Sequence, residues 1–360
     1  MEEFFMAENE EKVTPETEAK AEEAAAEEVA AEEVKAEVEG APEKKKGLGT
    51  GALIGIIAGG VVVLAAIAVF VLSFIFSSAA VKAYNAKDYA TAYEKVSFPL
   101  ASLTANKQTV AQIKYDYVVK SIAKAKKPEY FKGAKILNSL EGLIDQKKID
   151  EAFAISGFDL CKVGNVATLG QWEQDGDNSN GEEDLQWVVL DIKDTKNGAR
   201  ALLMTKDVVG FVEKWTKNET DLSYANSEVK AWCEIDFYMS IIQSSDFIKK
   251  NALNINVATD AVDGCQPCGD PTPAHAFALS YQEAQKYFAQ GSELAKWLEA
   301  DNCVVSEKAK YDGVTGKGFW LRNAGEKEGF ACSVNKGELA TGTAVYTAMG
   351  VRPCMWINLG

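Results

Sequence analysis

The sequence is poor in histidine, and it has no cysteine or tryptophan in its first 160 residues. His275 is the only histidine among 360 residues, and all seven Cys and all seven Trp follow residue 160. A Ser/His/Asp or Cys/His enzyme would have to use this histidine. Its setting, Pro273-Ala-His-Ala-Phe277, is typical of a structural residue at the start of a strand. The change in composition also predicts a domain boundary near residues 158–163.

No segment has the clustered positive charge that nucleic-acid binding requires. Residues 1–46 contain 16 Glu and 6 Lys, a net charge of −10. Residues 77–160 contain 13 basic and 9 acidic groups, a net charge of +4, and residues 161–360 contain 19 basic and 28 acidic groups, a net charge of −9. The lysines of the middle segment are spread among Tyr, Ala and Leu, a pattern typical of the solvated faces of helices. We therefore expect no nucleic-acid partner.

The N-terminal segment lacks the side chains that build a core. Residues 7–43 contain no aromatic residue, and four valines are their only large apolar side chains. Such a segment cannot bury enough apolar surface to offset the entropy lost on ordering. The sequence predicts a disordered acidic tail over residues 1–46.

One long run, Gly51–Phe76, has no charged residue. As a helix it would be about 39 Å long, enough to cross a hydrocarbon core of ~30 Å. A cleaved signal peptide would have a shorter leader, so we expect a single transmembrane helix within residues 47–77, with residues 51–76 in contact with membrane lipid. Lys44, Lys45 and Lys46 precede the run, and no charge follows it until Lys82. The positive-inside rule places the tail in the cytoplasm and residues 77–360 outside the cell membrane.

The apolar run also has a spacing of small residues that lets helices pack closely. Gly55 and Gly59 lie four positions apart, so the helix could form a homodimer. Glycine is common in membrane helices, however, and the pair is equally consistent with a monomer.

Residues 78–160 are predicted to form a helical stalk. Each of three segments has a short polar turn, a large apolar residue, and an alanine three or four positions later: Asn85–Tyr93, Lys127–Lys135 and Lys147–Phe153. A large and a small side chain then share one helical face, which allows a neighbouring helix to approach. The pattern resembles degenerate tetratricopeptide-like hairpins. An ordinary helical bundle acting as a spacer is the alternative.

Residues 161–360 are predicted to form an α+β domain. We expect a helix over Ser227–Ile241. A second helix is expected to begin after Ser280, where Ser280 and Glu283 form a capping box. Short apolar runs bounded by glycine turns predict the strands Val166–Trp172, Gln186–Ile192, Ala199–Thr205, His275–Leu279, Gly318–Leu321, Gly329–Val334 and Val351–Asn358.

Five elements of this domain follow one another in an order that resembles a known family. They are Val163–Gly170, Gln186–Leu190, Phe277–Tyr281, Phe319-Trp-Leu-Arg322 and Val351-Arg-Pro-Cys-Met-Trp-Ile357. Together they look like an uncharacterised bacterial extracellular domain family, over residues 163–360. That family is similar in fold to the formylglycine-generating-enzyme and C-type-lectin-like domains. The resemblance implies a fold of this type and no activity, because fold alone does not determine function.

The cysteines predict disulfides, because the positive-inside rule places them outside the membrane. Cys265 and Cys268 form a Cys-x-x-Cys pair between Asp263-Gly and Gly269-Asp-Pro, a loop rather than a redox helix. A disulfide is the leading interpretation. The alternatives are a zinc site that recruits His275 and Cys303, a redox pair, and unpaired thiols. No second Cys-x-x-Cys is present to complete the usual zinc set. The formylglycine-type copper chemistry cannot be assigned to Cys332 or Cys354.

The acidic loop 175–184 is the best candidate for a Ca²⁺ site. Its Asp175, Asp177 and Asp184 concentrate hard oxygen ligands, but the glycine spacing of an EF-hand is not met. A solvated hairpin loop is the alternative. Asn218 begins an Asn-x-Thr glycosylation sequence. Beyond these Ca²⁺ and Zn²⁺ alternatives, we expect no cofactor.

Two tryptophans are candidates for stacking on a ligand such as a sugar ring. Trp215 lies in a polar stretch and is expected to be exposed, and Trp320 belongs to the Trp-Leu-Arg element. No convergent catalytic set accompanies them. We therefore expect a membrane-anchored surface protein whose C-terminal domain binds a glycan or an envelope protein, rather than an enzyme. The alternatives are an oxidoreductase or formylglycine-type enzyme that uses a cysteine pair, and a structural envelope protein.

Overall fold

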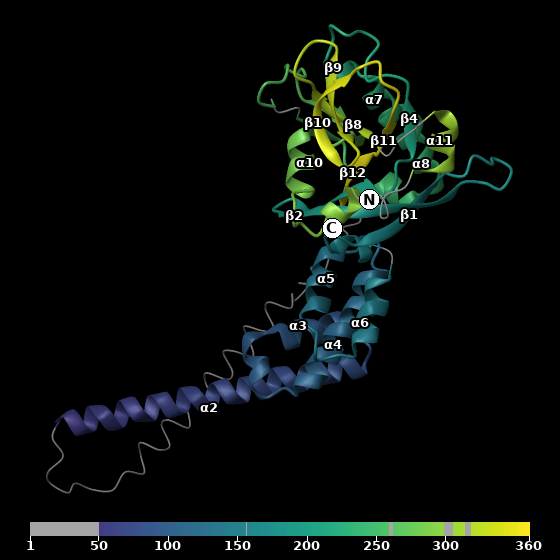
Figure 1. The fold of residues 1–360 in the computed structure, drawn as a ribbon. Coiled ribbons are helices and arrows are strands. Elements are labelled where there is room, and N and C mark those ends of the chain that lie inside the picture. The colour runs from purple at the N-terminus through teal and green to yellow at the C-terminus, as the bar shows by residue number, and fades with distance from the viewer. Residues whose placement is uncertain (1–49, 156, 259–261, 299–304, 314–317) are drawn as a thin grey trace, which may run out of the picture. The chain divides into compact units, whose positions relative to one another are not determined.

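The computed structural model describes residues 50–155, 157–258, 262–298, 305–313 and 318–360 (Figure 1). Side chains are described from Leu64 onward, apart from Ser102 and Tyr311. The predicted tail over residues 1–46 lies outside the described residues. The chain divides into two compact units, one ending at Ile113 and one beginning at Lys114, and each is considered by itself.

The first unit contains the predicted apolar helix. Helix α2 covers Thr50–Asn85, and within it Leu64–Asn85 is long and apolar enough to span a membrane, with a mean hydropathy of 2.5. Its Ile67, Phe70 and Phe74 are exposed. In its C-terminal half, the Oγ of Ser73 lies 2.7 Å from the Oγ1 of Thr104. Exposed apolar side chains are unfavourable in water, so the surface of the helix is compatible with membrane anchoring.

The rest of the first unit packs against the C-terminal end of α2. Helix α3, Tyr89–Ser97, begins where the Asp88 side chain accepts a hydrogen bond from the backbone N–H of Thr91. The 3-10 helix η1 covers Pro99–Leu103, and α4, Lys107–Lys120, contains the boundary between the units. The buried core here includes Ala80, Ala92, Val96 and Ile113.

Two helices lie near the start of the second unit, of which the first contacts the first sheet and the second packs against the first helix. They are α5, Tyr130–Asn138, and α6, Gln146–Phe153. The backbone N–H of Phe131 donates to the carbonyl of Leu359, and Lys135 pairs with Asp194 at 2.6 Å. The domain boundary predicted near residue 160 therefore lies inside the second unit. Tetratricopeptide-like repeats remain a prediction.

The second unit is a mixed α/β domain with two five-stranded sheets. The first sheet has the order β1-β2-β3-β12-β7 and is antiparallel throughout. Its strands are β1 Val166–Trp172, β2 Glu183–Thr195, β3 Gly198–Thr205, β12 Cys354–Asn358 and β7 Ala276–Phe277.

The second sheet has the order β10-β9-β8-β11-β4, with β11 parallel to β8 and the other pairs antiparallel. Its strands are β10 Glu338–Ala344, β9 Phe330–Asn335, β8 Phe319–Ala324, β11 Met349–Val351 and β4 Gly210–Val212. A separate pair consists of β5 Ile255–Val257 and β6 Thr272–Ala274.

Helices accompany the sheets of this domain. The predicted helix near residues 227–241 is a composite of α7 Glu228–Ala231, the π-helix η5 Trp232–Tyr238 and α8 Met239–Ser244, followed by α9 Asp246–Asn251. Helix α10, Tyr281–Tyr287, begins with the predicted capping box between Ser280 and Glu283, which is confirmed. The remaining helix is α11 Glu307–Asp312, and short 3-10 turns are η2 Ile122–Lys124, η3 Asp159–Cys161, η4 Tyr224–Asn226 and η6 Ala295–Leu298.

The prediction of a single strand over Val351–Asn358 is wrong. The segment changes sheet at Arg352-Pro353, so that β11 ends at Val351 in the second sheet and β12 begins at Cys354 in the first. Proline has no backbone N–H to donate to a ladder, which favours a break at this position. The result places the Arg-Pro pair between the two sheets.

Gly350 is expected to tolerate no side chain. It lies between β4 and β8, and a Cβ atom there would contact Val208 and lie 2.8 Å from the carbonyl oxygen of Gly318. We expect Gly350→Ala to destabilise the second unit by about 1–3 kcal/mol through overpacking. Gly342→Ala is the control, because its Cβ would meet only the flexible Glu326 carboxylate. Urea unfolding of both variants measures the difference, and equal midpoints would contradict the packing described.

Candidate functional site

A pocket of about 360 Å³ opens beside the first sheet of the second unit. Strands β2, β3, β5, β8 and β12 and helix α10 contribute to its wall. The lining residues that carry side-chain charge or an aromatic ring are Lys193, Arg200, Glu283, Lys286, Tyr287, Arg322 and Trp356. Its volume lies at the lower end of the roughly 300–1,000 Å³ that is usual for small-molecule sites.

Three side chains of the pocket come together through strand register. Lys193 on β2 is directly opposite Arg200 on β3, and Trp356 on β12 lies one diagonal step from Arg200 on the same face of the sheet. The Lys193 ammonium lies 4.9 Å from the centre of the Trp356 ring, and the Arg200 guanidinium lies 4.8 Å from it. The buried indole therefore holds two cations by cation–π contact.

These two cations have no anionic partner among the described residues. Like charges directly opposite each other on antiparallel strands are destabilising. The Nε of Arg200 is buried and has no hydrogen-bond acceptor within the described part of the chain. A buried donor without an acceptor costs free energy, so the pocket would be stabilised by a bound anion.

The other cations of the pocket are already paired. Lys286 contacts Asp191 at 2.9 Å, and the hydroxyl of Tyr287 donates to the same carboxylate at 2.8 Å. Burial alone would raise the pKa of Asp191, but the hydrogen bonds from Lys286 and Tyr287 outweigh it and hold that pKa below its usual value. Because the pKa of Asp191 is lower in the folded protein than in the unfolded chain, its ionised form stabilises the fold at pH values above the unfolded pKa of about 4. This contribution is lost as the pH falls through the pKa of the folded protein.

The Arg322 guanidinium is the centre of a structural network. It is 3% exposed, and it donates to the carbonyl oxygens of Ala258 and Ala278 and to the Glu283 carboxylate, at 2.6–2.9 Å. Glu283 also accepts the backbone N–H of Ser280 in the capping box. This arginine of the Trp-Leu-Arg element therefore fixes the start of α10, which forms one wall of the pocket.

Arg352 has a similar role between the two sheets. It is 1% exposed and donates to the carbonyl oxygens of Thr205, Lys206 and Trp297 at 2.6–3.2 Å. Its guanidinium lies 5.1 Å from the centre of the Phe319 ring. The arginine of the Val-Arg-Pro element thus joins segments that are distant in the sequence.

Arginine scarcity is a sequence signal that could have identified these residues. Only three of the 38 basic residues are arginines, namely Arg200, Arg322 and Arg352. Arginine is preferred to lysine where several acceptors, or a carboxylate, must be bound in a fixed geometry. Two of the three are buried in internal networks, and the third faces the pocket. Neither Arg200 nor Lys193 was predicted from the sequence.

The two predicted stacking tryptophans are not available to a ligand. Trp215 and Trp320 are both 0% exposed. The indole N–H of Trp215 donates to the carbonyl of Leu321 at 2.8 Å, which compensates for its burial. The expectation that Trp215 is exposed is wrong, because its ring and the neighbouring Thr216 are both buried, and its indole N–H has a backbone acceptor in the core. Neither tryptophan is part of the pocket.

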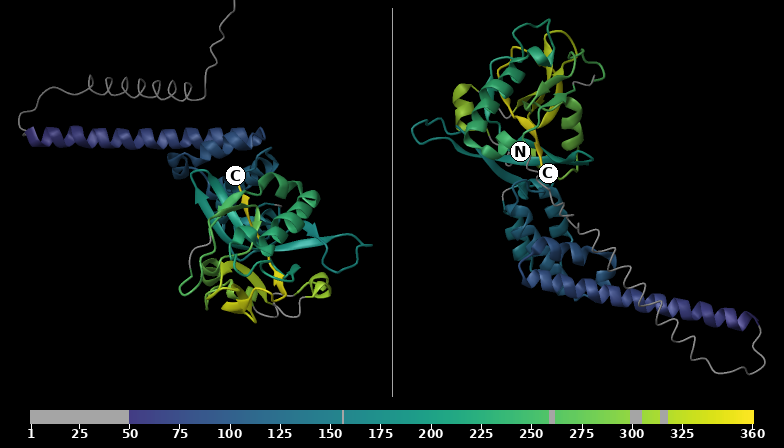
Figure 2. Two further views of the ribbon diagram at one scale, coloured as in Figure 1. Left: turned by 90° about the horizontal axis from the view of Figure 1, so that it is seen from above. Right: turned by 180° about the vertical axis from the view of Figure 1, so that it is seen from behind.

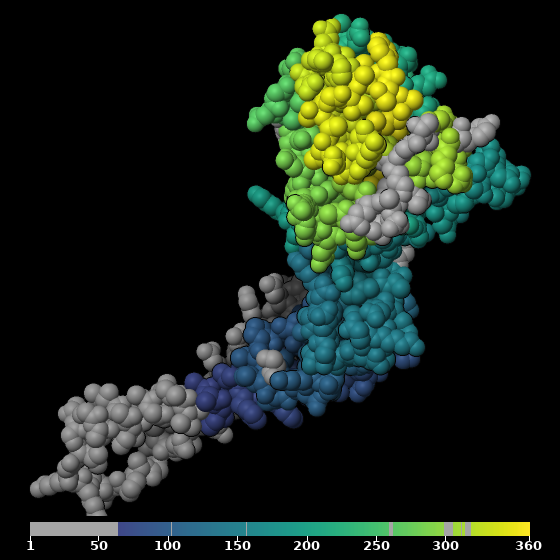
Figure 3. Space-filling model, viewed as in Figure 1, coloured from purple at the N-terminus to yellow at the C-terminus, as the bar shows by residue number. Residues whose placement is uncertain are grey.

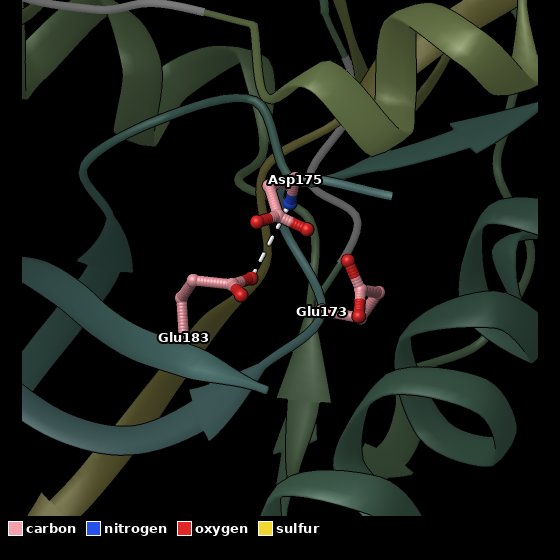
Figure 4. A group of neighbouring side chains, drawn as sticks. All are labelled: Glu173, Asp175 and Glu183. Atoms are coloured by element: carbon pink, nitrogen blue, oxygen red, sulfur yellow. Dashed lines mark hydrogen bonds between the residues drawn. The ribbon is translucent and has the colours of Figure 1, made fainter. Parts of the chain in front are cut away.

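The acidic loop between β1 and β2 projects from the second unit (Figures 2 and 3). Within it, one carboxylate oxygen from each of Glu173, Asp175 and Glu183 lies within 4.8 Å of the others (Figure 4). Asp175 was among the predicted Ca²⁺ ligands. Asp177 and Asp184 are not in this group: Asp177 accepts from Ser179, and Asp184 accepts from Gln171.

The carboxylates of this loop accept hydrogen bonds from the backbone N–H groups of the loop itself. Glu183 accepts the backbone N–H of Gln174 and Asp175, and Glu173 accepts that of Gly176 at 2.6 Å. Hydrogen bonds from the side chain of Asn180 and the backbone of Asp177 lower the pKa of Asp175. These contacts explain the turn without a cation, and calcium binding remains a prediction.

The Cys-x-x-Cys pair lies in the loop between β5 and β6, as predicted, but the structure shows no disulfide there. The six described cysteines are all thiols. Cys265 is partly exposed and Cys268 is buried. Cys303, the proposed partner in a zinc site, lies outside the described residues. Zinc binding therefore stays untested.

The remaining sequence candidates have structural contacts. The ring of His275 stacks on that of Tyr238, with 4.5 Å between the ring centres. The backbone N–H of His275 donates to the Glu234 carboxylate at 2.5 Å. Both contacts agree with a structural histidine. Asn218 accepts from the backbone and hydroxyl of Thr220 in an exposed turn. A second cavity, of about 910 Å³, is lined mainly by polar residues of α5, α6 and β1, among them Gln146, Asp150 and Thr168.

Comparison with protein families supports the predicted C-terminal domain in part. A family model described as a domain of unknown function (DUF6273) matches residues 198–359. No curated protein and no solved structure matches the chain. The C-terminal part of the chain is thus similar to a family of domains of unknown function, and Arg200, Arg322, Arg352 and Trp356 all lie within the matched segment.

Proposed function

We propose that the chain is a membrane-anchored binding protein whose C-terminal domain binds an acidic sugar in the Trp356 pocket. The observation that carries this proposal is the pair of unneutralised cations, Lys193 and Arg200, held side by side against Trp356. Helix α2 supplies the anchor, and the domain is displayed on the outer side of the membrane.

The size and charge of the pocket favour a small anionic ligand. A cavity of about 360 Å³ accommodates one or two sugar rings rather than a protein segment. Arginine binds a carboxylate through two parallel hydrogen bonds, which gives both affinity and orientation. The faces of Trp356 are next to Lys193 and Arg200, so the indole positions the cations and does not stack on the sugar.

Among glycans and envelope proteins, the acidic glycan is the better match. Its carboxylate would accept from Arg200 Nε and neutralise the repulsion across β2 and β3. The hydroxyl groups of a sugar could bond the polar rim, which includes Asn256 and Gln282. Cysteine-based catalysis is less favoured, because burial raises the pKa of the thiols of Cys265, Cys268 and Cys332 and suppresses the reactive thiolate.

We expect Arg200→Met to weaken the binding of acidic glycans by about 10- to 150-fold, since a hydrogen bond to a charged group contributes about 1.5–3 kcal/mol. Methionine keeps an apolar chain against Trp356 and removes the charge. Lys196→Met is the matched control, because this exposed lysine in the β2–β3 turn is not part of the pocket wall.

The measurement is a glycan array probed with the full chain in detergent. The proposal predicts retention on carboxylated glycans, little on their neutral counterparts, and loss of retention in Arg200→Met alone. Equal binding by Arg200→Met and Lys196→Met would refute the assignment of the pocket. An array without signal, together with capture of an envelope protein, would favour a protein partner instead.

A further inference from the structure

The second cavity, of about 910 Å³, lies beside an edge strand of the first sheet. Strand β1 has β2 as its one strand neighbour within the described residues, so the other side of its backbone has no ladder partner there. Val166 and Thr168 of β1 line the cavity together with one face of α6, which contributes Gln146, Ile149 and Phe153. The cavity therefore gives access to the unpaired side of β1.

The strand register decides which backbone groups of β1 face this side. The carbonyl of Asn165 accepts a backbone N–H of β2 at 3.0 Å, and alternate residues of an antiparallel strand direct their N–H and C=O to opposite sides. The groups of Val166 and Thr168 therefore point away from β2. The residue opposite Thr168 agrees with this register, because the carbonyl of Gln186 accepts the backbone N–H of Lys206 and is turned away from β1.

Further along β1 the same edge is closed by a side chain. The backbone N–H of Gln171 donates to the Oγ of Ser244 at 2.9 Å, and the carbonyl of Gln171 accepts from that hydroxyl at 3.3 Å. The serine of α8 thus takes the place of a neighbouring strand. A β-bulge between Thr168 and Gln171 separates the two parts of the edge. Edge strands that are not covered in this way can pair with another chain.

The charged side chains of the cavity favour a basic partner. Its wall contains the carboxylates of Glu141, Asp150 and Asp159 and the ammonium group of Lys162, a net charge of −2. None of the three carboxylates forms an ion pair within the part of the chain that the structure describes. Burial raises the pKa of Asp159, and a nearby cation would stabilise its ionised form.

We propose that the second cavity is a docking site for an extended basic segment of a partner protein, which adds to β1 as a further strand. The segment exchanges backbone hydrogen bonds with Val166 and Thr168, and its lysine or arginine side chains face the carboxylates of the wall. In this mode of recognition the main-chain hydrogen bonds give affinity and the side chains give specificity. The inference does not depend on the acidic sugar proposed for the Trp356 pocket.

Fluorescence anisotropy of labelled peptides, with the full chain in detergent, tests the docking. The first probe is the capped pentapeptide Lys-Val-Lys-Val-Lys, and Glu-Val-Glu-Val-Glu is its counterpart of opposite charge. Two further probes are the basic peptide N-methylated on its valines or on its lysines, which removes the donors from one edge of the strand and keeps the charge. We expect the basic peptide to bind and the acidic one not to bind. One methylated peptide should bind about 5- to 150-fold more weakly, and the other should bind like the parent.

Substitutions in the protein test the same contacts. Thr168→Pro removes an N–H that points away from β2, a position where an edge strand accepts proline. We expect it to weaken the basic peptide by about 2- to 15-fold, because one hydrogen bond is lost. Asp150→Asn should weaken it by about two- to five-fold. Glu151→Gln is the matched control and should have no effect, because this neighbouring carboxylate of α6 is not part of the cavity wall.

Three results would each overturn the proposal: no binding of the basic peptide at millimolar concentration, equal binding of the acidic and basic peptides, or equal affinities of the two methylated peptides. The last would show attraction by charge without strand pairing. Equal affinities of Asp150→Asn and Glu151→Gln for the basic peptide would refute the placement in this cavity. Circular dichroism shows whether Thr168→Pro is folded, and the methylated peptides test the backbone pairing on the unchanged protein.

Discussion

Arg352→Met is expected to destabilise the second unit by about 3–5 kcal/mol, a large fraction of the stability of an ordinary domain. The guanidinium is 1% exposed and binds the carbonyl oxygens of Thr205, Lys206 and Trp297. Methionine fills much of the space but donates nothing. Three carbonyl groups then lose a charged donor in a site that excludes water, and a buried acceptor without a donor is unfavourable by about 1–3 kcal/mol.

Urea unfolding of the full chain in detergent, followed by tryptophan fluorescence, measures this effect. Lys206→Met is the matched control, because Lys206 contributes to the network through its backbone carbonyl, which the substitution leaves in place. We expect the control to change the free energy of unfolding by less than about 1 kcal/mol. If Arg352→Met unfolds at the wild-type urea concentration, the network does not have the role described.

Substitution of two residues in the middle of α2 by aspartate is expected to release the chain from the membrane. Ile67 and Val71 are both exposed on the apolar helix. Each aspartate near the centre of a bilayer opposes insertion by about 2.5–3.5 kcal/mol, so Ile67→Asp with Val71→Asp opposes it by about 5–7 kcal/mol. This is large enough to shift most of the protein out of the membrane fraction.

Carbonate washing of membranes, followed by immunoblotting, separates the two states. The wild type and the control with alanine at both positions should stay in the washed membranes, because alanine lacks the charge. The double aspartate variant should appear in the soluble fraction or be degraded. Its retention in washed membranes at the level of the alanine control would show that α2 is not the anchor.

Local sequence patterns predicted the elements whose form depends on their own residues. The apolar run, strand β1 at Val166–Trp172 and the capping box at Ser280 are of this kind. Strand β10, Glu338–Ala344, was missed because its small and polar residues do not alternate with large apolar ones. The division of β11 from β12 was missed because most residues of the Val351–Asn358 run are apolar and buried, whichever sheet they belong to. The run therefore resembles one continuous strand.

The candidate pocket could not be predicted because it depends on register between strands. Lys193 and Arg200 are seven positions apart, and only the tight β2–β3 turn places them opposite each other. Trp356 joins them through the pairing of β12 with β3, more than 150 residues later in the chain. A polar neighbourhood was likewise a poor guide to Trp215, since its ring and the adjacent Thr216 are both buried and its indole N–H donates to the carbonyl of Leu321.

If Lys193 and Arg200 form an anion-binding pair, isothermal titration should detect the bound carboxylate directly. The full chain is titrated with glucuronate and with glucose, which differ by the carboxylate, at low and at moderate salt. We expect glucuronate to bind and glucose not to bind, and we expect the affinity for glucuronate to fall at higher salt, since screening reduces charge attraction. Equal affinity for the two sugars, or no binding of glucuronate under conditions where the protein is folded, would contradict the anion-binding pair.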